Sequence, residues 1–386
     1  MYNTRSLKPR HAPAAAAPNP LMSLFRGINL LALVLCFVVV VFGAYVRLSN
    51  AGLGCPDWPG CYGHLTVTAA ANTDASDVAR DFPSRPVVEA PKAWKEMIHR
   101  YLATTLGTLL LILAALAWLI SDLRHLRWLT LALIGTVCLQ GALGALTVLW
   151  NVNPVTVTGH LLVGLTTLAL LWWLWLRGTA ETAVAAPAGR ERAARSERQA
   201  WINAQHQQQG GAPAPSAPWG LRAYAVLALL LVVGQIFLGG WTSSNYAALA
   251  CPDFPACLGS FAPQTGIADA FKVWHGTGAN YEYGILDGAT RATIHLMHRY
   301  GALLLSLVLG GLALFLLATA RTTLWRRLGA ALLGALLLQV CIGISIVKLS
   351  LPLWLADAHN GGAALLLLAV VAVNFFAWRK PETVAA

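Results

Sequence analysis

Eight long stretches without a charged side chain decide what this chain of 386 residues can fold into. Each is rich in Leu, Ala and Val and has the length of about 20 residues that an α-helix needs to cross a bilayer. Helices of a soluble bundle keep one polar face, whereas these stretches are apolar on every side. The sequence therefore predicts an all-α integral membrane protein with eight transmembrane helices, at residues 27–46, 101–120, 129–150, 155–176, 223–241, 300–320, 328–347 and 358–378.

The distribution of basic residues predicts the orientation. The chain carries a net charge of +11, and its Lys and Arg residues gather in the tails and in the segments after the even-numbered spans. The opposite loops, 48–92 and 244–290, contain few basic residues. The positive-inside rule then places both termini in the cytoplasm. The positive charge is explained by topology, so the sequence gives no reason to expect a nucleic-acid partner.

The chain contains an internal repeat. CPDWPGC at 55–61 returns as CPDFPAC at 251–257, a shift of 196, and HRY at 99–101 returns at 298–300, a shift of 199. The longer shift also relates Gln140, Gly144 and His160 to Gln339, Gly343 and His359. Because each copy holds four spans, both copies have the same polarity in the membrane. We expect two tandem, pseudo-symmetric four-helix bundles.

Composition divides the rest of the chain around these bundles. The Pro- and Ala-rich tail and the polar stretch between the copies are expected to be disordered or flexible. The predicted division is a cytoplasmic tail at 1–24, an N-terminal half at 25–178, a cytoplasmic linker at 179–220, a C-terminal half at 221–379 and a tail at 380–386.

Each half carries two histidines inside its spans, separated by 61 residues in both cases: His99 with His160, and His298 with His359. Ionisable groups inside membrane helices usually mark a functional site. If the four helices begin near 93, 157, 291 and 357, the histidines of one half lie near the same end of non-adjacent helices. Two imidazoles on either side of a planar macrocycle are the axial ligands of haem iron, whereas zinc needs more ligands. Capping or packing roles are the alternative.

The two halves differ one helical turn before the HRY motif. The first half has Glu96 and the second has His295. Residues three apart share a helix face, so Glu96 is expected to face the first haem site, where a carboxyl could move protons or stabilise positive charge. An ion pair with Arg100 or Lys95 is the alternative. The asymmetry predicts that one site does chemistry and the other supports it.

Arginines and cysteines complete the candidate sites. Arg47, Arg100 and Arg299 lie near the outer ends of spans, where they could bind haem propionates or simply reach the membrane interface. The pairs Cys55–Cys61 and Cys251–Cys257 lie on the side that is oxidising in bacteria. We expect a disulfide in each half, with a redox-active thiol pair as the alternative.

These residues also resemble a known family. GAYVRLSNAGLGCPDWPGC at 43–61, EMIHRY at 96–101, CPDFPAC at 251–257 and AHN at 358–360 are similar to motifs of the haem A synthase family, in its bacterial form with paired extracytoplasmic cysteines. The resemblance implies an oxidoreductase of the bacterial inner membrane. It oxidises the C8 methyl of haem O to a formyl group by successive hydroxylations, which makes haem A for terminal oxidases.

The resemblance also implies roles for the sites. His99 and His160 would bind the substrate haem O, with Glu96 as the catalytic residue, and His298 and His359 would bind a haem b cofactor. Both sites would lie toward the extracytoplasmic side, and the farnesyltransferase that makes haem O is an expected partner. The stretch WHGTGANYEYG at 274–284 matches no motif of the family, so the resemblance assigns no function to residues 262–290. A diheme b-type cytochrome in quinone-linked electron transfer and a haem transporter are the alternatives.

Overall fold

The computed structural model describes residues 20–185, 217–275, 279–320 and 322–379. Within these ranges it is all-helical, and eight helices are long and apolar enough to cross a membrane, which confirms the predicted fold class. They are α1 (Pro20–Leu48), α4 (Ala90–Leu119), α5 (Arg127–Leu149), α6 (Pro154–Ala185), α8 (Trp219–Ser244), α10 (Gly288–Thr319), α11 (Thr323–Lys348) and α12 (Leu353–Trp378). Short helices lie in the connections: α2 (Val67–Ala71), α3 (Ala75–Asp81), η1 (Ser121–Leu126) and α9 (Ile267–Ala270).

The helices that carry the histidines begin three or four residues earlier than expected, at Ala90, Pro154, Gly288 and Leu353. Their first turns contain residues that an apolar window misses. Proline is tolerated in a first turn because the helix needs no N–H there. At the start of α10, the Asp287 carboxylate accepts a hydrogen bond of 2.8 Å from the Thr290 N–H. Each histidine therefore lies about 5 Å deeper along its helix than predicted.

The ends of the predicted divisions also shift. Helix α1 begins at Pro20 and α6 continues to Ala185, so parts of the expected tail and of the expected linker are helical. The remainder of these two segments, residues 1–19 and 186–216, and the tail at 380–386 lie outside the described residues.

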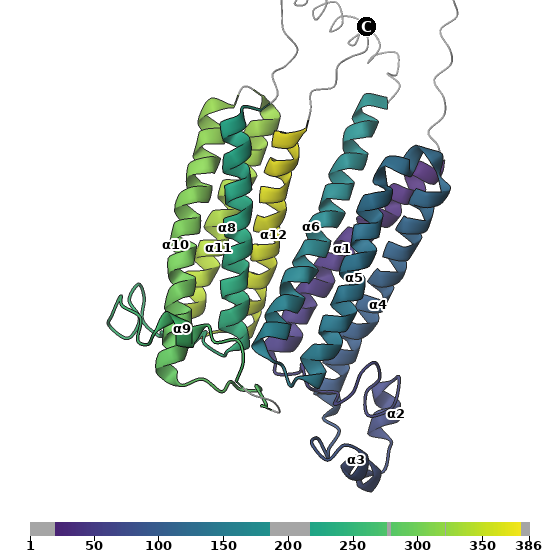
Figure 1. Cartoon of the computed structure of the whole chain (residues 1–386), viewed down its shortest axis with the longest axis vertical. Helices are drawn as coiled ribbons and strands as arrows, with labels where there is room; N and C mark the ends of the chain where they lie inside the picture. Colours follow the sequence, from purple (N-terminus) through teal and green to yellow (C-terminus); the bar gives the residue numbers. More distant parts are fainter. Residues whose placement is uncertain (1–19, 186–216, 276–278, 321, 380–386) are drawn as a thin grey trace, which may run out of the picture.

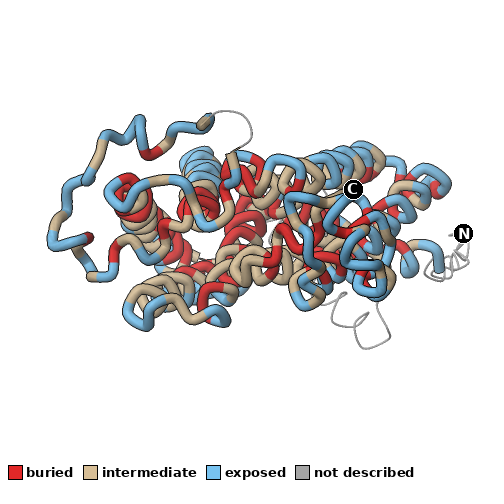
Figure 2. The backbone as a smooth tube through the Cα atoms, turned by 90° about the horizontal axis from the view of Figure 1, so that it is seen from below, coloured by how far each residue is buried: buried red, intermediate tan, exposed pale blue. Residues whose placement is uncertain are grey.

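The long helices form two groups that stand side by side (Figure 1). Helices α1, α4, α5 and α6 make the first half, and α8, α10, α11 and α12 make the second. The halves meet where α1 and α6 pack against α12 and α8. Helix α12 is the most buried span, with 61% of its apolar window inside the protein. Figure 2 shows buried backbone concentrated between the helices and exposed backbone around the outside.

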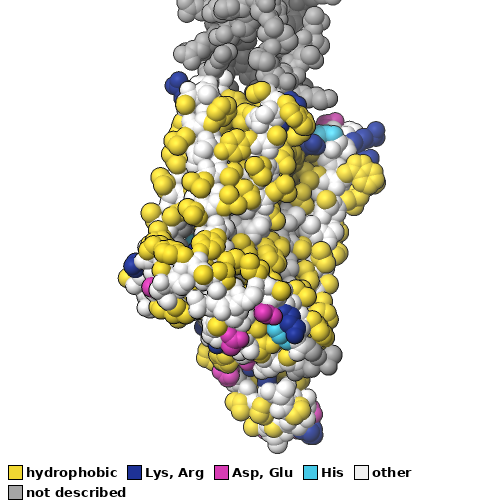
Figure 3. Space-filling view, turned by 60° about the vertical axis from the view of Figure 1, so that its left-hand side comes forward, with side chains coloured by type: hydrophobic (Ala, Val, Ile, Leu, Met, Phe, Trp, Pro, Cys, Tyr) yellow, Lys and Arg dark blue, Asp and Glu magenta, His cyan; other side chains and the backbone are white. Residues whose placement is uncertain are grey.

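The surface of the helical body is apolar. In Figure 3 hydrophobic side chains cover the long helices, and charged side chains gather toward the two ends. Leu111, Leu303 and Leu307 are 59%, 60% and 68% exposed. Exposing such apolar side chains to water costs free energy, whereas contact with lipid chains does not. This distribution agrees with a multi-pass membrane protein.

The loop of the second half reaches across to the first half. The Tyr281 ring packs with Leu53, Val148 and Val152, and the Tyr281 N–H donates to the Asn151 carbonyl at 3.1 Å. Next to it, Glu282 forms a 2.5 Å ion pair with Arg85. Residues 281 and 282, in the stretch 274–284 that matched no family motif in the sequence, therefore connect the two loop regions.

Candidate functional site

Each of the four histidines lies within about three turns of the start of its helix, at Ala90, Pro154, Gly288 or Leu353. The short helices α2, α3 and α9 lie beyond this end of the long helices (Figure 1). In the first half the ring centres of His99 and His160 are 6.4 Å apart, with an angle of 71° between the planes. In the second half, His298 and His359 are 6.5 Å apart at 79°. Helices α4 and α6, and likewise α10 and α12, bring together residues that are 61 positions apart. The predicted pairing is therefore present in both halves.

Each of the four rings packs against a glycine of a neighbouring helix. A Cβ added at Gly43 would lie 2.7 Å from Cε1 of His99, and one at Gly144 would lie 3.4 Å from Cε1 of His160. The second half repeats this arrangement at Gly239 for His298, with 3.2 Å, and at Gly343 for His359, with 3.0 Å. A Cβ at Gly43 would force the His99 ring to move, and one at Gly239 or Gly343 would crowd its ring, whereas one at Gly144 would only touch it.

The donor set fits a haem iron. Two metal–nitrogen bonds of about 2 Å, plus the radius of each ring, separate the ring centres of axial imidazoles by about 6 Å. Both pairs have this separation. The Nδ1 atoms of His99, His160 and His359 are buried without a hydrogen-bond partner, and all four residues are of intermediate burial. No group of three or more His, Cys, Asp and Glu residues in the described ranges could hold a bare metal ion.

Glu96 lies between the first histidine pair and the first cysteine loop. Its side chain is buried, and Oε2 accepts a 2.9 Å hydrogen bond from the Cys55 N–H. Oε1 forms an ion pair with Arg100, one of the two alternatives expected from the sequence, whereas Lys95 lies over the Tyr45 ring at 5.1 Å. Gly54 makes this approach possible, because a Cβ there would come within 2.6 Å of the α4 backbone at Lys92. The carboxylate thus connects α4 to the cysteine loop.

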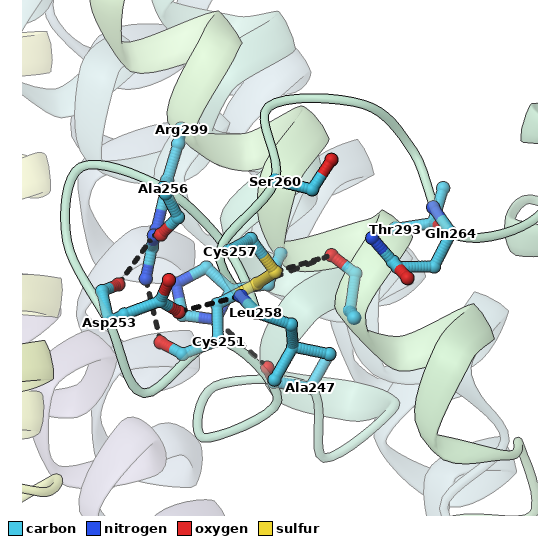
Figure 4. Close-up of a disulfide and its surroundings, with 12 residues drawn as sticks. Ala247, Cys251, Asp253, Ala256, Cys257, Leu258, Ser260, Gln264, Thr293 and Arg299 are labelled. Atoms are coloured by element: carbon cyan, nitrogen blue, oxygen red, sulfur yellow. Dashed lines mark hydrogen bonds between the residues drawn. A yellow bond between two sulfur atoms is a disulfide. The ribbon is translucent and has the colours of Figure 1, made fainter.

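The corresponding position in the second half is organised without a carboxylate. His295 is buried, and its Nδ1 lies 3.1 Å from the Ala247 carbonyl oxygen. The Nη2 of Arg299 donates to the Cys251 carbonyl at 2.7 Å (Figure 4), whereas the Nη2 of Arg100 donates to Glu96. The second pair therefore has no acidic neighbour one turn away.

Both predicted disulfides are formed, and both close a loop with a sequence separation of 6. The motif around them fastens the loop. In the second half the Asp253 carboxylate accepts from the Leu258 N–H at 2.7 Å and the Gly259 N–H at 2.8 Å. These backbone hydrogen bonds, that from Gly259 most of all, hold the pKa of Asp253 below its usual range. Asp57 makes the same two contacts in the first half, to Tyr62 and Gly63.

The HRY motif has a structural meaning that the sequence did not reveal. Beside each histidine, the arginine donates to loop carbonyls: Arg100 Nη1 to Asp57 and Gly60, and Arg299 Nη1 to Asp253 and Ala256. The tyrosine hydroxyl donates to the other side of the loop, Tyr101 to Leu65 and Tyr300 to Phe261. The signal was available, because the two motifs recur together in both halves.

The third arginine, Arg47, contacts the other half. Its Nη2 donates to the Ser243 carbonyl at 2.8 Å at the C-terminal end of α8, where helix carbonyls attract positive charge. Its guanidinium also lies 4.2 Å from the centre of the Tyr246 ring. All three candidate propionate-binding arginines therefore have protein partners, while the Nε atoms of Arg47 and Arg299 are buried without one.

The fold and the sites define a class: a multi-pass helical membrane protein with two repeated bis-histidine sites under disulfide-closed loops. A profile of the family COX15-CtaA, described as cytochrome oxidase assembly protein, matches residues 26–371. The chain therefore belongs to the COX15-CtaA family.

Named relatives agree with this assignment. A Heme A synthase from Shewanella oneidensis is 40% identical over 351 residues, which cover 91% of this chain and 96% of that protein. Heme A synthases from Allorhizobium ampelinum and Caulobacter vibrioides are 25% and 26% identical, and the matches cover 90% and 89% of this chain and 87% and 92% of those proteins. The resemblance found in the sequence motifs is thus confirmed.

Proposed function

We propose that this chain is a haem A synthase, an oxidoreductase that converts the C8 methyl of haem O to the formyl group of haem A. The observation that carries the proposal is the inequality of two otherwise matched sites. Both halves bring two histidines to the separation of axial ligands, but only the first has a buried carboxylate one turn away.

The first pair, His99 and His160, would bind the substrate haem O. Glu96 would act beside it as the catalytic residue, able to take up or release a proton at Oε1 or Oε2. Its bonds to Arg100 and to the Cys55 N–H fix the direction of the carboxylate, and Arg100 balances its charge. The disulfide loop covers this carboxylate and limits the access of water.

The second pair, His298 and His359, would bind haem b, which supplies one-electron redox chemistry when bound. His295 stands where the first half has Glu96 and lies 3.1 Å from the Ala247 carbonyl oxygen, so at this position the second half offers no carboxylate for proton transfer. Arg47, Arg100 and Arg299 would bind the haem propionates through side-chain N–H groups that do not already donate to protein oxygens, such as the Nε of Arg47 and of Arg299.

The location follows from the same proposal. The protein would lie in the bacterial inner membrane with both termini in the cytoplasm, the four-helix halves at 25–178 and 221–379, and the haem sites toward the extracytoplasmic side. The enzyme that makes haem O by farnesylation would be a partner, because its product is too apolar to diffuse through water.

The decisive experiment is pigment analysis. Membranes that contain this protein are supplied with haem O, and the extracted haems are separated by chromatography and identified by mass. Appearance of haem A or of its hydroxylated precursor supports the proposal. If haem O remains unchanged while both histidine pairs bind haem, the chain is a diheme cytochrome or a haem transporter.

A further inference from the structure

Three glutamines within the spans each donate a side-chain hydrogen bond to the backbone carbonyl of one of the paired histidines. The side-chain N–H of Gln140 donates to the carbonyl of His160 at 2.9 Å, that of Gln235 to His298 at 3.0 Å, and that of Gln339 to His359 at 3.1 Å. Each bond joins neighbouring helices of one half: α5 to α6, α8 to α10 and α11 to α12. In lipid such a bond stabilises the packing of two helices because the amide has no water to bind.

Glycines make room for these amides. A Cβ at Gly164 would come within 2.6 Å of Gln140 Nε2. Cβ atoms at Gly301 and Gly362 would collide with Oε1 of Gln235 and of Gln339. Each of these glycines follows its histidine by one turn, so glutamine, glycine and histidine form a repeated unit. Two of the amides also approach the imidazole itself, Gln235 at His298 Nδ1 with 3.0 Å and Gln339 at His359 Nε2 with 3.3 Å.

His99 is the exception. The repeat shift of 196 places Val39 where the second half has Gln235, and the shift of 199 places Leu102 where it has Gly301. Both components of the unit are therefore replaced together. Gly43 of α1 packs against the His99 ring, but among the described residues no side-chain hydrogen bond ties α1 to α4 beside this histidine.

Groups that orient the ring of a metal-binding histidine commonly change metal affinity tenfold or more. Gln235 and Gln339 contact the ring itself, and all three glutamines bind the backbone that carries it. A cofactor site benefits from two held ligands. A substrate site must release what it binds, and therefore needs one ligand that can move. The second half holds both of its histidines with glutamine, whereas the first half holds only His160.

We propose that Gln140, Gln235 and Gln339 are positioning residues for three of the haem ligands, and that His99 is the ligand that gives way when the first site exchanges its haem. This inference rests on the proposed function, since it assumes that both pairs bind haem. The first site would then release its haem by movement of His99 at the contact between α1 and α4.

The test is haem loss from the purified full-length protein, loaded with haem b at both sites and mixed with excess apomyoglobin. The loss should follow two phases, a fast one from the first site and a slow one from the second. Q235M, which keeps the shape of the side chain but removes the donor, should accelerate the slow phase about tenfold. V39Q/L102G, which builds the missing unit beside His99, should slow the fast phase by a similar factor.

Asn374 offers a matched control. It is a buried amide that ties α12 to α8 through a 2.8 Å bond to the Ala225 carbonyl, 15 residues beyond His359. N374L should change neither phase, and equal acceleration by N374L and Q235M would overturn the inference, because the effect would then be one of general packing. If V39Q/L102G does not accumulate, Q140M decides, with the expected result that it accelerates the fast phase only.

The result also separates the inference from the function on which it rests. A protein without the visible spectrum of low-spin haem at either pair contradicts the proposed function. Two bound haems that leave at one common rate, or a slow phase that Q235M does not change, contradict only the role of the glutamines and of His99.

Discussion

The two halves share their framework and differ in what surrounds it. Both have a histidine pair at nearly the same separation, glycines against the rings, and a disulfide loop fastened by the arginine and tyrosine of the HRY motif. The first half adds a buried carboxylate and leaves His99 without a glutamine, whereas the second replaces the carboxylate with His295 and holds both ligands. With the proposed roles, the same framework would serve a reactive site in the first half and a retentive site in the second, and these few side chains would account for the difference.

The largest expected effect tests the carboxylate. E96Q keeps the shape of the side chain but removes its charge, and should lower haem A formation about 10² to 10⁴-fold, the usual contribution of a general acid or base. Haem content should stay close to that of the wild type. H295Q, the matched change in the second half, should leave the rate within tenfold. Chromatography of extracted haems measures both variants, and a fully active E96Q would remove Glu96 from the chemistry.

The second prediction concerns the ion pair. R100Q leaves a buried carboxylate without its cation, which typically costs about 3 to 5 kcal/mol. Adding E96Q to it should restore part of the lost stability, because the unpaired charge disappears. In the second half, H295Q should not restore stability to R299Q, because Arg299 donates to the Cys251 carbonyl and forms no ion pair with residue 295. Thermal unfolding of the purified variants in detergent gives the comparison, and additivity in both halves would show that the pair is not coupled.

The third prediction compares the effects of removing each disulfide. Both close loops of the same length, so chain entropy contributes about 2 kcal/mol in each half. C55S/C61S should nevertheless reduce haem A formation far more than C251S/C257S, because the Cys55 N–H binds Glu96. Equal loss of activity at equal haem content would assign both disulfides a purely structural role.

A smaller effect on stability is expected from removing the Arg85–Glu282 ion pair, which joins the two halves. The Arg85–Glu282 pair is partly accessible, with side chains 21% and 11% exposed, so its removal by E282Q should cost about 1 kcal/mol. Hydrogen exchange at residues 279–284 should become faster. The charge swap R85E/E282R should restore protection, and failure of the swap would mean that the pair contributes by shape rather than by charge.

The smallest effect is expected at Asp253 in the second cysteine loop, and it should depend on pH. Hydrogen bonds from Gly259 and Leu258 lower the pKa of Asp253 in the folded protein, so this carboxylate stabilises the loop above its unfolded pKa of about 3.9. The stabilisation is lost as the pH falls through the lower, folded pKa. At neutral pH, D253N should therefore weaken amide protection at residues 258–259, and the difference from the wild type should vanish in strong acid. A difference that persists there would point to a cause other than charge.

Sequence was sufficient for the eight spans, the pairing of the histidines and both disulfides, because hydropathy and the repeated motifs report on them directly. It placed the histidines too shallow, since Pro154 and Asp287 start their helices outside the apolar windows. The Glu96–Arg100 pair was one of two alternatives, and only the path of the loop at Gly54 decides between them. The contacts of Tyr281 and Glu282 could not be predicted, because their segment has no copy in the first half.

The contacts of Tyr281 and Glu282 have a consequence for the symmetry of the molecule. Both residues bind the first half from the loop of the second. The loop of the first half contains no Tyr-Glu sequence, so two copies of that half could not form this connection. The two halves are therefore not interchangeable, although their helices and histidine pairs match.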